Sequence, residues 1–271
     1  MNKQLTYKGT IINYTTTGSG YTVVLLHGFL ENLTMWDEFK KDLSTNNNVV
    51  AIDLPGFGQS GIMSNNHSMS TMANAVEYVL DKENISKCVM IGHSMGGYVT
   101  LAFAELFENR LDGIILFHSQ AAADDEEAKI NRNRTITIVE NNHAKFISGF
   151  IPSLFTEDNA IKFSSEIDQL IKSSLLTKNE GIIAALAGMR DRKDYRELLT
   201  ELTIPVLFIA GKKDTRIPLE KIIQQISLPK ISEALLLEDV GHMGFIEDKD
   251  HTYKSIESFV TRHSNHKKNR P

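Results

Sequence analysis

Short hydrophobic runs alternate along the chain with longer segments whose hydrophobic positions recur at helical spacing. Continuous runs of this length predict parallel strands that are covered on both faces of a sheet. We therefore expect most of the chain to form a parallel sheet. The runs lie at residues 23–26, 49–53, 89–91, 113–117, 206–210 and 234–237.

The segments between these runs predict helices. Strands that alternate with helices form right-handed βαβ units, so the fold class is α/β. Two further segments near the start of the chain, 4–8 and 10–16, predict an antiparallel hairpin at one edge of the sheet. The helices are expected at residues 35–43, 69–82, 95–107, 219–227 and 248–262.

The alternation breaks between about residues 119 and 202, where no strand pattern is found and the periodicity is helical at 124–141, 159–176 and 181–190. Ligands of parallel sheets bind at the carboxyl ends of the strands, so we expect this insertion to cap that edge. A purely structural helical layer is the alternative. The predicted division is an α/β core of residues 1–118 and 203–262, a helical cap of residues 119–202 and a polar tail of residues 263–271.

A tight turn carries the strongest local signal. Residues 92–97 read Gly-His-Ser-Met-Gly-Gly, which matches G-x-S-x-G between a predicted strand and a predicted helix. Glycine is needed on both sides because larger residues would collide with neighbouring backbone, and the turn lifts the Ser94 hydroxyl clear of the sheet. Ser94 is the predicted nucleophile.

An acid and a base follow later strands. Asp214 comes after the run at 206–210 and Gly211, and His242 lies between two glycines after the run at 234–237. Ser, Asp and His occur in the chain order expected for a catalytic triad on a parallel sheet. We predict that His242 accepts the proton of the Ser94 hydroxyl and that Asp214 orients the histidine. The other histidines are assigned to turns beside the site (His27 and His93) or to helices, the cap and the tail.

Two backbone N–H groups are the predicted oxyanion hole. Phe29 follows His27 and Gly28 at the end of an early strand, and Met95 follows the nucleophile. Both positions lie where donors to a developing negative charge are required.

Composition bears on which binding partners and which cellular location we expect. The chain has 29 basic and 34 acidic residues and a net charge of −5, which argues against a nucleic-acid partner. The single cysteine, Cys88, allows no internal disulfide, and its apolar surroundings predict a buried thiol rather than a reactive one. With no secretory signal or membrane-length apolar run, we expect a cytoplasmic protein without a membrane span.

These motifs, together with residues 53–60 (Asp-Leu-Pro-Gly-Phe-Gly-Gln-Ser), resemble the α/β-hydrolase superfamily over nearly the whole chain. Residues 187–194 resemble a segment of small carboxylesterases and enol-lactonases. The resemblance implies an eight-stranded sheet, a helical cap after the sixth strand and no cofactor. Haloalkane dehalogenases and epoxide hydrolases are also similar, but their nucleophile is aspartate, so Ser94 argues against both.

The predicted function is hydrolysis of small carboxylic esters through an acyl-enzyme on Ser94. Enol-lactone, thioester or C–C bond hydrolysis on the same triad, and a ligand receptor with little turnover, are the alternatives. Four residues of the insertion are candidates for the pocket wall, with core packing as the other interpretation: Phe146, Phe150, Phe155 and Met189.

Overall fold

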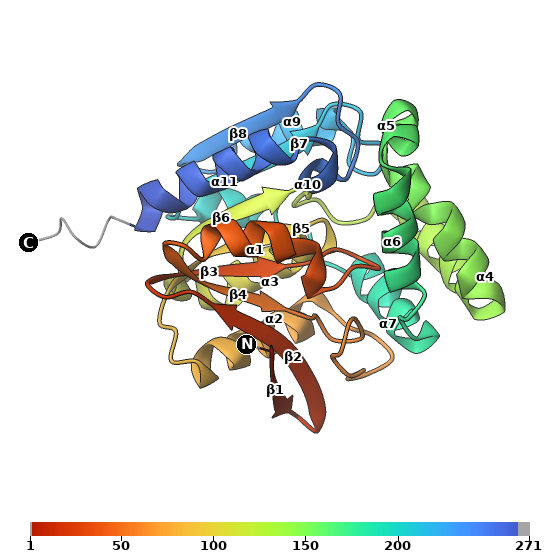
Figure 1. The fold of residues 1–271 in the computed structure, drawn as a ribbon, viewed down its shortest axis with the longest axis horizontal. Coiled ribbons are helices and arrows are strands. Elements are labelled where there is room, and N and C mark those ends of the chain that lie inside the picture. The colour runs from red at the N-terminus through yellow and green to blue at the C-terminus, as the bar shows by residue number, and fades with distance from the viewer. Residues whose placement is uncertain (1, 265–271) are drawn as a thin grey trace, which may run out of the picture.

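An eight-stranded sheet forms the centre of the computed structural model, which describes residues 2–264 (Figure 1). The strand order is β1-β2-β4-β3-β5-β6-β7-β8. The β1–β2 hairpin lies at one edge, and β2 pairs antiparallel with both β1 and β4. All the other pairs, from β4–β3 to β7–β8, are parallel. The predicted mostly parallel sheet is confirmed. The strands are β1 (Asn2–Tyr7), β2 (Thr10–Thr17), β3 (Tyr21–Leu26), β4 (Asn47–Ile52), β5 (Cys88–His93), β6 (Leu111–Phe117), β7 (Val206–Gly211) and β8 (Ser232–Leu237).

The central strands are buried along their whole length. All six residues of β5 and of β7 are buried, as the continuous hydrophobic runs predict. The prediction of cover on both faces is wrong for β8, where Ala234 and Leu236 are exposed. β8 is the outermost strand and has a neighbouring strand on one side only.

Helices cover both faces of the sheet. Figure 1 shows α1 and α11 on the near face and α2 and α3 behind it. Helix α2 begins where Ser68 accepts a hydrogen bond from the Thr71 N–H, which satisfies one free donor of the first turn. The core helices are α1 (Asp37–Leu43), α2 (Met69–Lys82), α3 (Met95–Phe107), α9 (Leu219–Ile226), α10 (Gly244–Glu247) and α11 (Lys249–Ser264), with short 3-10 helices η1 (Leu33–Trp36) and η2 (Glu108–Arg110).

The predicted helical insertion follows β6 and lies at the carboxyl ends of the strands, on the right of Figure 1. The predicted end of the first inserted helix at residue 141 is confirmed, because the backbone at Asn142 is non-helical; a second helical stretch follows, and α4 covers both. The prediction of one helix at 159–176 is wrong, because the segment is divided at Phe163. The short α8 was not predicted. The insertion contains α4 (Glu126–Phe150), η3 (Pro152–Leu154), α5 (Glu157–Lys162), α6 (Ser164–Ser174), α7 (Asn179–Arg190) and α8 (Arg196–Glu201).

The exact division into core and cap at residues 118 and 203 stays a prediction. Of the predicted tail, His263 and Ser264 are the last residues of α11, and the rest lies outside the described residues. No helix within residues 2–264 is long and apolar enough to cross a membrane.

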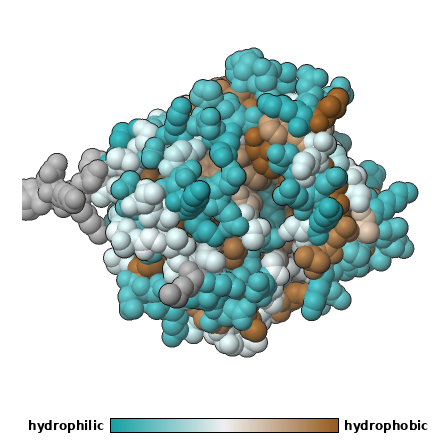
Figure 2. All heavy atoms as spheres, in the orientation of Figure 1, coloured by the Kyte–Doolittle hydropathy of each residue, from teal (hydrophilic) through white to brown (hydrophobic). Residues whose placement is uncertain are grey.

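Hydrophobic side chains gather along the seam between the sheet layers and the cap, while most of the remaining face is hydrophilic (Figure 2). A groove of about 540 Å³ follows this seam, and its wall includes Met35 of η1 and Leu170 of α6. Deeper inside, Trp36 is fully buried and packs against Phe117 and Phe245, so it belongs to the core.

Candidate active site

Ser94 sits on a strained turn between β5 and α3. Its φ of 49° and ψ of −112° lie in a region that residues with a side chain rarely adopt. The neighbouring glycines make the turn possible: a Cβ on Gly92 would lie 2.2 Å from the Gly96 carbonyl oxygen, and one on Gly96 would lie 2.5 Å from that of Leu26. The turn is held at its centre by the Ser94 N–H, which donates to the Phe117 carbonyl at 2.8 Å.

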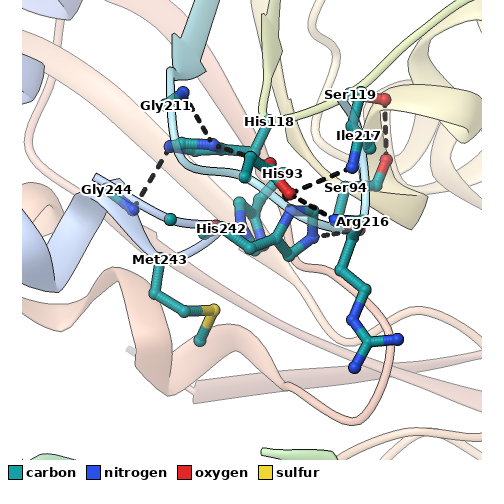
Figure 3. Close-up of polar contacts among 12 residues, drawn as sticks. His93, Ser94, His118, Ser119, Gly211, Arg216, Ile217, His242, Met243 and Gly244 are labelled. Atoms are coloured by element: carbon teal, nitrogen blue, oxygen red, sulfur yellow. Dashed lines mark hydrogen bonds and ion pairs between the residues drawn. The ribbon is translucent and has the colours of Figure 1, made fainter. Parts of the chain in front are cut away.

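Three side chains from distant loops meet at this turn (Figure 3). The Ser94 hydroxyl lies 2.9 Å from Nε2 of His242, and Nδ1 of His242 lies 2.7 Å from Oδ2 of Asp214. Because the carboxylate oxygen of Asp214 can only accept, Nδ1 of His242 carries the proton. Nε2 of His242 is then free to accept from the Ser94 hydroxyl. The structure thus brings together the predicted nucleophile, base and acid in hydrogen-bonding order.

Asp214 is held in its ionised form. Its Oδ1 accepts from the backbone N–H groups of Arg216 at 2.8 Å and Ile217 at 3.0 Å, which leaves Oδ2 for His242. Burial would raise the pKa of this carboxyl, but His242 and His118 lower the pKa well below its usual range. The carboxylate therefore keeps its charge and can hold the histidine in one orientation.

A second histidine contacts the same carboxylate. His118 follows β6 directly, with a φ of 46°, and its Nδ1 lies 3.3 Å from Oδ2 of Asp214. Backbone N–H groups approach both ring nitrogens, Gly244 at 3.2 Å from Nε2 and Gly211 at 3.4 Å from Nδ1. The shorter contact at Nε2 and the Asp214 carboxylate beside Nδ1 favour the proton on Nδ1. The assignment of the remaining histidines to turns, helices, cap or tail is wrong for His118. Like Ser94 and Asp214, it follows a parallel strand, and that position was the signal that could have found it.

His118 gives a testable pH dependence. Burial lowers its pKa from the usual 6.5 to about 4. The unfolded chain takes up this proton below pH 6.5 whereas the folded chain does not until about pH 4, so His118 costs stability as the pH falls through that window. Between pH 6.5 and 5 we expect wild type to lose about 2 kcal/mol more of its unfolding free energy than His118→Gln, measured by urea denaturation. The exposed His251→Gln is the control, and an identical pH dependence in wild type and His118→Gln would contradict the assignment.

A buried ion pair supports the loop that contains Phe29. Oε2 of Glu31 accepts from the Gly28 N–H at 2.6 Å and from Nδ1 of His93 at 2.9 Å, while Nε2 of His93 donates to the His242 carbonyl at 3.0 Å. Burial would lower the pKa of His93, but the Glu31 carboxylate raises it. Both ring nitrogens of His93 thus act as donors, and one imidazolium ties this loop to the nucleophile turn and the histidine loop. The role of Glu31 was missed because it depends on a partner far away in the sequence.

The predicted oxyanion donors are backbone N–H groups that take no part in the hydrogen bonding of the surrounding loops. Within residues 2–264, no acceptor is found for the N–H groups of Phe29 and Met95. Met95 is the first residue of α3, where backbone donors have no partner inside the helix. The Glu31 bond to Gly28 fixes the backbone directly before Phe29.

The loop that carries His242 is fixed by a buried carboxylate and by the cap. Glu247 accepts from the N–H groups of Gly241 at 3.0 Å and Met243 at 2.9 Å, on either side of the histidine. The His242 N–H donates to the Leu154 carbonyl of η3 at 2.8 Å. The histidine is therefore positioned in part by the inserted helices.

Ser94 and His242 open onto a cavity of about 370 Å³ between the sheet edge and the cap. Three of the four residues proposed for the pocket wall line it, namely Phe146, Phe150 and Met189. Phe155 does not, and packs in the hydrophobic core instead.

One cluster in the described part of the chain has the chemistry of a metal site. Ligand atoms of His118, Asp214 and His242 lie within 4.8 Å of one another. The same atoms hydrogen-bond to each other through Oδ2 of Asp214. A cation bound there would replace the bond that orients His242, so these residues fit a proton-transfer chain better than a metal centre.

Comparison with known proteins places this geometry in a family. Residues 21–249 match the family described as alpha/beta hydrolase fold. The chain belongs to the alpha/beta-hydrolase family. Among solved structures, this hydrolase is similar to a thermophilic esterase from Thermogutta terrifontis in a malate-bound form, with a TM-score of 0.92 and 30% identity over 97% of this chain and 99% of that one. The enol-lactonase from Burkholderia xenovorans LB400 shares the fold, with a TM-score of 0.89 and 20% identity over 96% of this chain and 100% of that one.

Curated relatives of this alpha/beta hydrolase differ in length. The pimeloyl-[acyl-carrier protein] methyl ester esterase of Pseudoalteromonas atlantica is 28% identical, over 88% of this chain and 93% of the relative. The chain spans only 64% of a dihydrolipoyllysine-residue acetyltransferase component of the acetoin cleaving system from Pseudomonas putida, at 28% identity over 90% of this chain. It spans 56% of abhydrolase domain-containing protein abhd-5.2 from Caenorhabditis elegans, at 26% identity.

Proposed function

We propose that this alpha/beta hydrolase is a serine carboxylesterase that cleaves small esters. The observation that carries the proposal is the hydrogen-bond chain from Ser94 through His242 to Asp214 at the wall of an internal cavity. The similarity to an esterase of nearly the same length supports this reaction class. A cavity of about 370 Å³ suits a small substrate.

The proposed mechanism has two steps. His242 takes the Ser94 proton as Oγ attacks the ester carbonyl, and the N–H groups of Phe29 and Met95 bind the oxyanion. His242 then gives its proton to the leaving alcohol, and the acyl group stays on Ser94. In the second step His242 activates a water molecule, which attacks the acyl-enzyme and releases the acid. No cofactor takes part, and a cytoplasmic setting stays a prediction from the single cysteine.

A substrate panel tests the reaction class. We expect sustained hydrolysis of p-nitrophenyl acetate and butyrate and a lower kcat/KM for the octanoate, because a long acyl chain exceeds the cavity. Thioesters, an enol-lactone and a β-diketone are measured alongside. A single burst of p-nitrophenol without further turnover would favour a ligand receptor, and a higher kcat/KM for the thioester, lactone or diketone would replace the ester assignment.

A further inference from the structure

Two guanidinium groups line the cavity that contains Ser94. Arg132 lies on α4 of the insertion, and Arg216 lies on the loop after β7, two residues after Asp214. Figure 3 shows the Arg216 side chain extending away from its loop, with its guanidinium unconnected to the other residues drawn. The catalytic chain described above does not use either guanidinium.

Arg132 contacts one carboxylate within residues 2–264, and it shares this carboxylate with another arginine. Its Nε donates to Oδ2 of Asp124 at 3.0 Å, while Oδ1 of Asp124 accepts from Nη1 of Arg192 at 2.5 Å. Arg192 is buried and also donates to the carbonyls of Ala122 and Met189, so its role is to hold the cap. One negative charge thus serves two guanidinium groups, and the group of three carries a net positive charge at the cavity wall.

Arg216 has no acidic partner of its own within residues 2–264. Its Nη2 donates to the Ser153 hydroxyl, and its guanidinium lies 4.8 Å from the centre of the Phe150 ring. Asp214 is near, but its oxygens are taken by the histidines and by loop N–H groups. Burial lowers the pKa of Arg216, Asp214 raises it, and the positive charge of Arg132, which lines the same cavity, lowers it again.

The stacked ring links Arg216 to the oxyanion side of the site. Phe150 lies between the guanidinium and Phe29, whose ring is 5.9 Å away in an edge-to-face arrangement. A guanidinium stacked on an aromatic ring keeps its in-plane N–H groups free to bind a ligand. Arg132 and Arg216 line the same cavity, and the two carboxylates among its lining residues already have other partners: Asp124 is shared with Arg192, and Glu31 is paired with His93. The two cations therefore form a site for an anion.

We propose that the cavity binds half-esters of short dicarboxylic acids, with Arg216 and Arg132 holding the free carboxylate while the ester lies at Ser94. This substrate class rests on the proposed esterase function. The parallel N–H groups of a guanidinium match the two oxygens of a carboxylate, and a bound anion removes the repulsion between the two cations. The phosphate of a larger acyl carrier is the other anion that these groups could bind, but the small cavity favours the short dicarboxylate.

A matched pair of esters tests the proposal. Monoethyl adipate and ethyl hexanoate have the same chain length and differ by a carboxylate in place of a methyl group, and a pH-stat follows their hydrolysis. We expect wild type to prefer the half-ester by at least about 10-fold in kcat/KM, and Arg216→Gln to lower that preference by about 10- to 100-fold, as for a lost charge-assisted hydrogen bond. Arg216→Lys keeps the positive charge but loses the two parallel N–H groups of the guanidinium. Its preference for the half-ester should lie between those of wild type and Arg216→Gln. A merely structural defect lowers both rates together and leaves the ratio unchanged.

The control is Lys213→Gln, on the same loop but exposed and paired with Asp239 outside the cavity; it should keep the wild-type ratio. A wild-type preference for ethyl hexanoate, or a ratio that Arg216→Gln does not change, would overturn the proposal. A larger effect of Arg216→Gln on butyryl-coenzyme A than on monoethyl adipate would assign the anion as a phosphate and overturn the carboxylate.

A binding measurement separates this inference from the reaction itself. Calorimetric titration of monoethyl adipate into Ser94→Ala needs no turnover, and adding Arg216→Gln should raise Kd by at least about 10-fold. If wild type hydrolyses neither ester, the esterase proposal fails while this titration still decides the anion site. Equal Kd values in the two variants would overturn the anion site, whatever the enzyme hydrolyses.

Discussion

Ser94→Ala is expected to lower kcat for p-nitrophenyl butyrate by about 10⁶-fold, the size of effect seen when a serine hydrolase loses its nucleophile. The hydroxyl lies 2.9 Å from Nε2 of His242, and no other hydroxyl hydrogen-bonds to this ring within residues 2–264. The oxyanion N–H groups stay in place in this variant, so a small rate above the uncatalysed reaction should remain. The measurement is steady-state hydrolysis at high enzyme concentration.

Stability should change little in Ser94→Ala, because the side chain is small and the backbone bond from Ser94 to Phe117 is kept. The control is Ser64→Ala, an exposed serine away from the cavity, which should keep full activity. Activity of Ser94→Ala within about 10-fold of wild type, in a folded protein, would remove Ser94 from the mechanism.

Asp214→Asn is expected to lower kcat by about 10⁴-fold while the fold is kept. One carboxylate oxygen accepts from the N–H groups of Arg216 and Ile217, so the amide of asparagine must turn its own oxygen towards them. Its NH₂ group then faces His242 and requires a lone pair on Nδ1 of the histidine. The ring proton moves to Nε2, which can no longer accept from the serine.

Circular dichroism, ligand binding and the exposed Asp239→Asn variant distinguish this effect from a loss of folding. Asp239 lies at the surface and pairs with Lys213, so its variant should keep wild-type kinetics. The Asp214→Asn protein should keep its circular dichroism and bind ligands as before. A loss of less than about 10-fold in kcat would show that Asp214 does not select the histidine tautomer.

The residues that sequence reasoning found share one property: each follows a strand and has a glycine within three residues. Ser94, Asp214 and His242 could be located because such turns have few sequences that fit them, and the strained φ of Ser94 with close backbone at Gly92 and Gly96 explains why. The strands of the sheet could also be predicted from the sequence, since buried parallel strands require continuous hydrophobic runs.

The residues that it missed depend on partners far along the chain. Glu31 acts through its bond to His93. Arg216 becomes a candidate for anion binding because Arg132 lines the same cavity and the carboxylates there have other partners. The sequence around Arg216 does not show which charged side chains line the same cavity. The division of the segment 159–176 at Phe163 and the exposure of β8 were missed for a related reason, because packing between the inserted helices and position at the sheet edge decide them.

Covalent labelling with a fluorophosphonate, read by intact mass and peptide mapping, identifies the nucleophile. We expect one label per chain, on the peptide that contains Ser94, with labelling slowed by at least about 100-fold in His242→Ala because the general base is lost. A label on another residue, or no reaction in folded protein under conditions that label a known serine esterase, would contradict the assignment of Ser94 as the nucleophile.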